Sequence, residues 1–346
     1  MPAIKVLFVA SANKGDITPV VLNQGRSLAS EEVEVHYFGI EGKGVFGYMG
    51  NIGRLRERIR DVQPDLIHAH FSYCGFVASL AARKLPVVVS LMGSDLAGGG
   101  LHRQFTGVGP LRYLFTGGAF RSLAGGASRY LSAFFSRFVW DRTIVKSGWM
   151  AERTWEGRTA VIPNGVDLSR FLPMGGREAL KQKHGFPEGK KHILFFADPA
   201  RREKNFALAQ SSMEFVFRED VELLPVHGLP PDAMPELINA ADVVLLTSRW
   251  EGSPNIVKEA MACNCPVVAT DVGDIGWLFG DEPGYYRSWP DAAHLAKDIR
   301  AALDLREKPQ ALNGRGRILE LGLDSAAIAR RITAEYNAVL EEKRHS

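Results

Sequence analysis

The sequence is poor in cysteine and contains no long apolar run. Its three cysteines, Cys74, Cys263 and Cys265, cannot all pair with one another, and no second ligand pair accompanies Cys263 and Cys265 to complete a zinc site. Free thiols in a reducing compartment are therefore expected. The apolar run 6–10 is shorter than the core of a secretion signal, and no segment reaches the length of a membrane span. These absences predict a cytoplasmic protein.

A strong charge of either sign is also absent, since 42 basic and 39 acidic side chains leave a formal net charge of +3. This balance is too small to imply nucleic-acid binding, so any basic binding site must come from local clustering. Apolar residues make up 46% of the chain and charged residues 23%, which is typical of a globular protein. The length of 346 residues exceeds what one hydrophobic core usually supports, which favours two domains.

Short β-branched apolar runs alternate with longer amphipathic stretches, a pattern typical of parallel strands buried between helices. In the first half the predicted strands are 4–10, 33–38, 65–71, 86–92, 142–146 and 159–162. In the second half they are 192–197, 221–226, 242–247, 266–270 and 285–289. Helical pattern fills most of the gaps, for example 51–62, 75–83 and 147–155. Each half is therefore predicted to form its own doubly wound α/β unit.

A turn-rich segment separates the two halves. Residues 163–167 read Pro-Asn-Gly-Val-Asp, and the polar stretch after them runs through a pair of glycines at 175–176. We expect an N-terminal domain over 1–165, a C-terminal domain over 166–324, and a final helix over 325–346 that could pack back on the N-terminal domain. Ligands of open α/β sheets bind beyond the carboxyl ends of the strands, so the chemistry is expected in the loops there.

One such loop is EGSPNIVKE, residues 251–259, which leads from a predicted strand into an amphipathic run. Ser253 is expected to be the N-cap of a helix and Pro254 its first residue. The open amides of Asn255, Ile256 and Val257 then offer a site for a phosphate at the positive end of the helix dipole.

Two glutamates flank this helix start, Glu251 before it and Glu259 inside the helix. Carboxylates accept hydrogen bonds from hydroxyl groups, and sugars offer many of them, so a diphosphate with a sugar on either side is the economical ligand. Glutamates at a fixed spacing are common, however, and Glu259 could equally be a solvated helix residue and Glu251 a plain turn residue.

A second loop of the same kind is Arg-Arg-Glu-Lys-Asn, residues 201–205, which follows the first strand of the second half. Arg201 and Lys204 are positioned to neutralise a diphosphate. A solvated charge run of mixed sign is the alternative, and it suits Arg202 and Glu203 better than the other two.

Together these segments resemble the family 4 retaining glycosyltransferases. ADVVLLTSRWEGSPNIVKEAMACNCPVVATDVGDI is similar to the signature segment of that family, RREKN to its diphosphate-binding motif, and VIPNGVDLSRF to its interdomain segment. The resemblance implies the GT-B fold, in which two Rossmann-like doubly wound domains face a cleft. It covers the second half of the chain well and the first half only in outline.

The resemblance also implies roles for the quoted residues. Glu259 would bind the ribose of a nucleotide-sugar and Glu251 the donor sugar, while Arg201 and Lys204 would hold the diphosphate. The turn itself, from Gly252 to Val257, would supply its amides. The loop with His227 and Gly228 would lie near the base. Catalysis would consist of positioning and charge neutralisation, with no metal and no cofactor.

The first half departs from the pattern of the family, whose members often carry a histidine where this chain has Met92. Asp95 is a speculative substitute for contact with the acceptor. Of the two histidines in the segment IHAHF, at least one should be a core histidine, and His70 is the one expected to face the cleft. Gly15, after the first strand, permits close approach of a ligand to the backbone, although an ordinary turn is nearly as good an interpretation.

Acidic residues are missing altogether between Asp95 and Asp141. Arginines and aromatic residues alternate there instead: Arg103, Phe105, Arg112, Tyr113, Phe115, Phe120, Arg121, Arg129, Tyr130, Phe134, Phe135, Arg137, Phe138 and Trp140. Such a surface could contact an anionic membrane or receive a lipid-linked acceptor. The alternative is an insertion whose aromatic residues pack on the first domain. Nucleic acid is a poorer partner because no recognition motif accompanies the basic residues.

The sequence thus predicts a retaining hexosyltransferase that moves a sugar from a nucleotide-diphosphate sugar to a glycan or lipid-linked acceptor in surface polysaccharide biosynthesis. It would work in the cytoplasm, or at the cytoplasmic face of the membrane. Two other hypotheses stay open: a nucleotide-sugar epimerase of GT-B fold, and a non-catalytic subunit that binds a sugar nucleotide.

Overall fold

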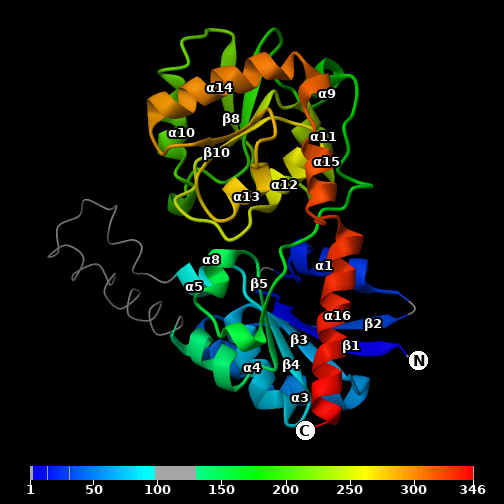
Figure 1. The fold of residues 1–346 in the computed structure, drawn as a ribbon. Coiled ribbons are helices and arrows are strands. Elements are labelled where there is room, and N and C mark those ends of the chain that lie inside the picture. Colours follow the sequence, from blue (N-terminus) through cyan, green and yellow to red (C-terminus); the bar gives the residue numbers. More distant parts are fainter. Residues whose placement is uncertain (1–2, 14, 31, 98–129, 346) are drawn as a thin grey trace, which may run out of the picture. The chain divides into compact units, whose positions relative to one another are not determined.

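The computed structural model describes residues 3–13, 15–30, 32–97 and 130–345, and the chain divides into two compact units (Figure 1). Unit 1 contains Met1–Pro163 and Ile328–Ser346, and unit 2 contains Asn164–Ala327. None of the helices within the described ranges is both long and apolar enough to cross a bilayer.

Unit 1 is built on a six-stranded sheet whose strand order is β2-β1-β3-β4-β5-β6. The strands are β1 (Ile4–Ser11), β2 (Val33–Ile40), β3 (Leu66–His70), β4 (Val87–Ser90), β5 (Arg142–Val145) and β6 (Thr159–Val161). All neighbouring pairs are parallel, with Val6 opposite both Val35 and Leu66. Every residue of β3 and β4 is buried, as strands covered on both faces require.

The helices of unit 1 are α1 (Pro19–Leu28), α2 (Gly44–Met49), α3 (Ile52–Val62), α4 (Ser72–Ala82), α5 (Ser94–Ala97), α8 (Gly148–Ala151), the short η2 (Glu156–Arg158) and a helical stretch over 130–138. The last helix, α16 (Ser325–Arg344), begins in unit 2, and from Ile328 onward it belongs to unit 1. Its Tyr336 hydroxyl lies 2.6 Å from Nδ1 of His68, and Arg142 of β5 forms ion pairs with its Glu335 and Glu342.

Unit 2 carries a five-stranded sheet in the order β11-β10-β9-β7-β8, again wholly parallel. The strands are β7 (Lys191–Phe195), β8 (Val221–Pro225), β9 (Val243–Leu246), β10 (Val267–Thr270) and β11 (Tyr285–Ser288). The helices are α9 (Arg177–Lys183), η3 (Arg202–Lys204), α10 (Phe206–Met213), η4 (Pro231–Ala233), α11 (Met234–Ala240), α12 (Asn255–Ala262), α13 (Ile275–Phe279), α14 (Ala292–Arg306), η5 (Pro309–Ala311) and α15 (Gly314–Glu320).

The predicted fold class is therefore confirmed: each unit is a parallel sheet with flanking helices, and each predicted strand is present. In unit 2 the order of the strands reverses at β7: β8 lies on one side of β7, and the next strand along the chain, β9, lies on its other side. In unit 1 the corresponding reversal lies between β1 and β3. The loops beyond the carboxyl ends of strands at such reversals are the places where open α/β sheets bind ligands.

Candidate functional site

The loops after β7 and β9 are bound to each other at the reversal of unit 2. The Thr247 hydroxyl lies 3.0 Å from the carbonyl oxygens of both Lys204 and Asn205. The backbone N–H of Arg249 donates to the carbonyl of Glu203 at 2.8 Å. These bonds hold the Arg201–Asn205 segment against the loop that leads to Glu251.

Lys204 and Glu251 meet directly in this region. The Lys204 Nζ lies 2.5 Å from Oε1 of Glu251, and the Ser248 hydroxyl donates to the same oxygen at 2.7 Å. Only 18% of the lysine side chain and 14% of the glutamate side chain are exposed. Because the ammonium group has three donors, one bond to Glu251 fixes its position and leaves others for an anionic ligand.

Arg201 is placed more loosely. Its guanidinium pairs with Glu203, Nη2 to Oε1 at 2.7 Å, and 55% of its side chain is exposed. Glu203 therefore holds Arg201 in place. The sequence analysis had favoured a solvated charge run for Glu203 and did not predict this ion pair. Burial raises the pKa of Glu203, but hydrogen bonds from its own backbone and from Arg201 outweigh it and lower the pKa below its usual value. Arg201 and Lys204 thus share one loop, each oriented by a carboxylate.

The helix predicted after the Gly-Ser-Pro turn is α12, but its start was predicted wrongly by one residue. Pro254 is the N-cap, with φ −72° and ψ 117°, and Asn255 is the first helical residue. Ser253 does not cap the helix, because no side chain makes a cap hydrogen bond there. The first amides of a helix have no intrahelical acceptor, so those of Asn255, Ile256 and Val257 remain available to an anion.

The loop after β10 packs closely against the backbone of this turn. Gly273 has φ +65°, and a Cβ built on it would lie 2.7 Å from the Gly252 carbonyl oxygen and 3.1 Å from that of Glu251. Only glycine fits both this conformation and this spacing. The position of the Glu251–Gly252 backbone therefore depends on the absence of a side chain at residue 273.

Substitution of Gly273 by alanine should destabilise the protein by about 1–3 kcal/mol, because the added methyl group must displace backbone atoms. It should also weaken binding of a nucleoside diphosphate, since the turn before α12 would move. Thermal unfolding and calorimetric titration measure the two effects. Gly189→Ala is the matched control: its φ is +71°, but no neighbouring atom of the described residues lies within 4 Å of the added Cβ. Equal effects in both variants would show that the turn tolerates displacement.

Glu259, in the second turn of α12, has an unusual environment. Glu259 is half-buried, and its carboxylate makes no hydrogen bond or ion pair within the described ranges. Burial raises its pKa to about 7, against the opposing charges of Lys258 and Arg170. A carboxylate in this state is satisfied by hydroxyl donors from a ligand, as the predicted ribose would supply.

Lys258, next to Glu259, is a functional candidate that the sequence analysis missed. Its side chain is fully buried, and its Nζ donates to the Asn164 carbonyl at 2.8 Å. The signal was present in the helical pattern, because residue 258 shares a face with the core residues Met261 and Ala262.

The remaining residue pair predicted for unit 2 stands apart. His227 and Gly228 lie in the loop after the edge strand β8, both exposed, and Gly228 has φ +71°. They are at the same edge of the sheet as the loops after β7 and β9. No hydrogen bond or ion pair joins the His227 side chain to those loops in the part of the chain that the structure describes.

In unit 1 the structure places Asp95 and His70 inside the protein. Asp95 is 3% exposed, and its two oxygens accept the backbone N–H groups of Ser72 at 2.8 Å and Met92 at 2.6 Å. It thus ties the loops after β3 and β4 together. Burial raises its pKa, although these bonds oppose the effect. Its carboxylate serves the fold, which weakens the hypothesis that it contacts an acceptor.

His70 is 2% exposed, so the expectation that it faces a cleft is corrected: the side chain is buried. Neither ring nitrogen has a hydrogen-bond partner among the described residues, and burial, with the nearby charge of Lys146, lowers its pKa to about 3. It stacks on His68, whose Nε2 lies 2.9 Å from the Ser90 hydroxyl. His68 is therefore the core histidine that was expected.

Gly15 lies after β1, beside the reversal of unit 1. It has φ +99°, and among the residues that the structure describes no neighbouring atom lies within 4 Å of a Cβ built on it. Its N–H donates to the Ala12 carbonyl at 3.0 Å, as in a tight turn. The open space is compatible with a ligand but equally with an ordinary turn.

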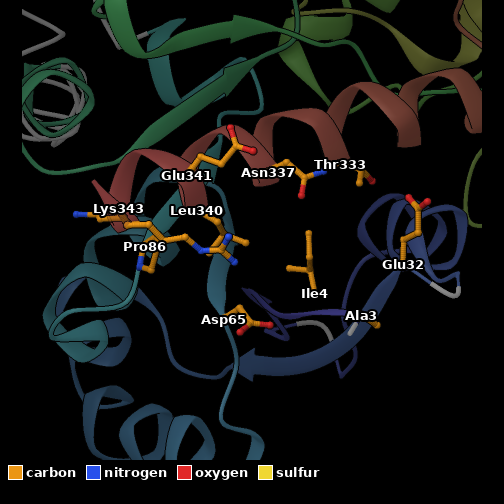
Figure 2. Close-up of a pocket in the computed structure, with 11 residues that line it drawn as sticks. Ala3, Ile4, Glu32, Asp65, Pro86, Thr333, Asn337, Leu340, Glu341 and Lys343 are labelled. Carbon is orange, nitrogen blue, oxygen red and sulfur yellow. The ribbon is translucent and has the colours of Figure 1, made fainter. Parts of the chain in front are cut away.

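A pocket of about 830 Å³ opens at the opposite edge of unit 1, between the amino ends of the strands and α16 (Figure 2). Thr333 and Asn337 of α16 line it on one side, and Ile4 and Asp65 on the other. Because ligands of open α/β sheets bind at the carboxyl ends of the strands, this pocket is not part of the candidate site.

The arginine- and aromatic-rich segment is only partly described. Arg103, Phe105, Arg112, Tyr113, Phe115, Phe120, Arg121 and Arg129 lie outside the described residues. Phe135 and Trp140 pack in the core of unit 1, in keeping with the insertion hypothesis, whereas Phe134 and Phe138 are 53% and 60% exposed.

Comparison with known proteins adds to this geometry. The family model described as Glycosyltransferase Family 4 matches residues 11–170, and the one described as Glycosyl transferases group 1 matches residues 218–318. A Bacillus subtilis (strain 168) protein named as a teichuronic acid biosynthesis glycosyltransferase is 28% identical over 81% of this chain and 72% of its own length. A D-inositol 3-phosphate glycosyltransferase of Geodermatophilus obscurus is 31% identical over 43% of this chain and 41% of its own.

Solved structures share the fold at low sequence identity. Sucrose-phosphate synthase from Thermosynechococcus elongatus superposes with a TM-score of 0.77 at 16% identity, over 98% of this chain and all of that chain. Anabaena HepE in complex with UDP gives a TM-score of 0.70 at 16% identity, over 97% of this chain and all of that chain.

Proposed function

The chain belongs to the family 4 glycosyltransferases of GT-B fold, and from this premise we propose that it transfers a hexosyl-type sugar, with retention, from a nucleotide-diphosphate sugar to a glycan or lipid-linked acceptor. The observation that carries the proposal is the uncapped start of α12 beside the Lys204–Glu251 pair. The amides bind the diphosphate, and the carboxylates of Glu251 and Glu259 bind the sugar and the ribose.

Other proteins support the choice of ligands. The HepE structures contain UDP and UDP-glucose, which favours a uridine nucleotide as the donor. An Escherichia coli relative, 27% identical over 36% of this chain, is named as a galactosyltransferase that acts on a sugar linked to diphosphoundecaprenol. This favours a lipid-linked acceptor. The Bacillus relative is named for teichuronic acid biosynthesis, and we propose a role in surface polysaccharide biosynthesis for this chain.

In the proposed reaction the bond between the anomeric carbon and the diphosphate oxygen breaks while the acceptor oxygen bonds to the same face of the sugar. The departing diphosphate takes the proton of the acceptor hydroxyl. The contribution of the protein is to position the reactants and to neutralise the leaving group, through Lys204, Arg201 and the amides of α12. The mechanism assigns no step to a metal or a cofactor.

Product analysis tests this function against the two alternatives. The protein is incubated with UDP-glucose or UDP-galactose, with and without a diphosphoundecaprenol-linked sugar, and products are identified by mass spectrometry and NMR. Transfer yields UDP and a glycosylated lipid only when the acceptor is present. An epimerase would change the donor sugar without acceptor, and a non-catalytic subunit would bind the donor and leave it intact. Either of these results would overturn the proposed reaction.

The proposal places the reaction at the cytoplasmic face of an anionic membrane. The helical stretch 130–138 exposes Phe134 and Phe138, and Arg137 lies 5.0 Å over the Phe138 ring and 4.1 Å over that of Trp155. Trp155 is itself 43% exposed. Aromatic side chains beside a cation are well suited to the boundary between lipid head groups and acyl chains.

The double variant Phe134→Ser/Phe138→Ser should bind vesicles containing phosphatidylglycerol about a hundredfold or more weakly, because each buried aromatic side chain contributes about 1.5–3 kcal/mol. Sedimentation with vesicles measures the effect. Phe217→Ser, which removes an 80% exposed phenylalanine from unit 2, is the control and should bind like wild type. Undiminished binding of the double variant would remove this surface from the proposal.

A further inference from the structure

We propose that Lys258 is a positioning residue of the donor site: it fastens α12 to Asn164 and keeps a positive charge beneath Glu259. This inference rests on the proposed function, because it assumes that α12 and Glu259 hold the donor nucleotide. Lys258 itself is fully buried, so we assign it no direct contact with the donor.

The geometry joins Lys258 to the start of unit 2. The Nζ of Lys258 donates to the Asn164 carbonyl at 2.8 Å, and the Asn164 side-chain amide lies 3.3 Å from Oδ1 of Asn255. Asn164 therefore contacts α12 at two places, one of them the first residue of the helix. A hydrogen bond from a charged donor is among the stronger ones in a protein interior.

The segment that follows Asn164 is itself tied down inside unit 2. Val166 forms a β-bridge with Asp324, its N–H donates to the Leu323 carbonyl at 2.9 Å, and its own carbonyl accepts the Ser325 N–H at 2.9 Å. Lys258 thus attaches α12 to a segment whose backbone is hydrogen-bonded to residues 323–325. The orientation of the helix start, and of the amides there, depends on this attachment.

Charges around Lys258 explain why a lysine is needed. Burial lowers its pKa to about 8, while Asp274 and Glu259 act in the opposite direction. In return, the charge of Lys258 lowers the pKa of both carboxyl groups. Burial outweighs this effect, and the resulting pKa is about 7 for Glu259 and about 6 for Asp274. Two more charges face these groups: Arg170 lowers the pKa of Glu259 and Glu251 raises that of Asp274.

A further charged side chain lies against the last turn of this helix. Arg315 of α15 donates to the Ala262 carbonyl at 3.3 Å, at the far end of α12. Of the two positive charges that lower the pKa of Glu259, Lys258 acts more strongly than Arg170, and its removal should leave that carboxyl group protonated at a higher pH. A protonated carboxyl has lost acceptor capacity for the ribose hydroxyls.

The test is a titration of UDP into wild type, Lys258→Met and Lys181→Met, from about pH 5 to about pH 9. In wild type, affinity should fall as the pH drops through the pKa of Glu259. In Lys258→Met this fall should occur about one pH unit higher, because the pKa of Glu259 rises when the opposite charge is lost. Lys181→Met also removes a buried lysine from unit 2, one paired with Asp242 at 2.9 Å, and should keep the wild-type profile.

Lys258→Arg supplies a second measurement, because it retains the charge but alters the contact with Asn164. It should keep the wild-type pH profile and lose affinity at every pH. The role of Lys258 would be overturned if the pH profile of Lys258→Met superimposed on that of wild type. If Lys258→Met does not fold, wild-type affinity in Lys258→Arg would overturn it. Failure of the proposed function looks different: wild type would not bind UDP, or Glu259→Ala would bind it as tightly as wild type.

Discussion

Replacement of Lys204 by methionine is expected to lower kcat by about 10²–10³-fold, the loss found when one preorganised donor to a developing charge is removed. Lys204, on the loop after β7, is held at 2.5 Å by Glu251 of the loop that leads to α12, and the proposed mechanism places the departing diphosphate there. Folding should suffer less, because the Ser248 hydroxyl still donates to Glu251. Initial rates over a range of donor and acceptor concentrations separate the effect on kcat from that on KM.

Lys183→Met is the matched control for this variant. Lys183 is also an ion-paired lysine of unit 2, 2.8 Å from Glu236, but 61% of its side chain is exposed and it lies on α9. Its loss should leave kcat unchanged. If Lys204→Met kept the wild-type kcat, Lys204 would have no part in stabilising the leaving group.

The largest loss of stability is expected from Asp242→Ala, which should lower the free energy of unfolding by about 3–5 kcal/mol. Asp242 is fully buried and accepts from Lys181 at 2.9 Å and from the His192 N–H at 2.7 Å. Its removal leaves the Lys181 ammonium, on a side chain only 5% exposed, without its buried counter-charge. Urea unfolding measures the loss, and hydrogen exchange in β7 and β9 locates it.

The control for this prediction is Asp220→Ala. Asp220 pairs with Arg218 at 2.7 Å, but 45% of its side chain is exposed, so its loss should cost less than about 1 kcal/mol. Similar costs for the two variants would mean that burial does not strengthen the Asp242 pair.

The pattern of buried strands was enough to predict the fold, because it is a local property of the sequence. Runs such as 243–246 are apolar throughout, which is typical of a strand covered on both faces. Single helical turns were harder. Helix was predicted over 147–155, yet α8 ends at Ala151, and the residues that follow form turns and η2 instead.

The start of α12 shows how a local signal can mislead by one residue. Serine is a strong N-cap, which favoured Ser253, but Pro254 already has the extended backbone of a cap. Ser253 therefore points elsewhere, and its hydroxyl lies near enough to Asp274 to lower the pKa of that carboxyl group.

The candidate site was predictable where it depends on topology and not where it depends on packing. Strand order brings Lys204 and Glu251 to one edge of the sheet, although 47 residues separate them. The helical spacing places residue 258 on the core face of α12, but no spacing in the sequence reveals the hydrogen bond of Lys258 to Asn164 or the burial of His70. These are the positions at which the sequence analysis missed a residue or misplaced one.

The most direct test of the account is a crystal structure of the protein with UDP. We expect the diphosphate on the backbone amides of Asn255–Val257, with the Lys204 ammonium beside it and the ribose hydroxyls on the Glu259 carboxylate. A diphosphate bound away from the start of α12, with those amides facing only solvent, would contradict it.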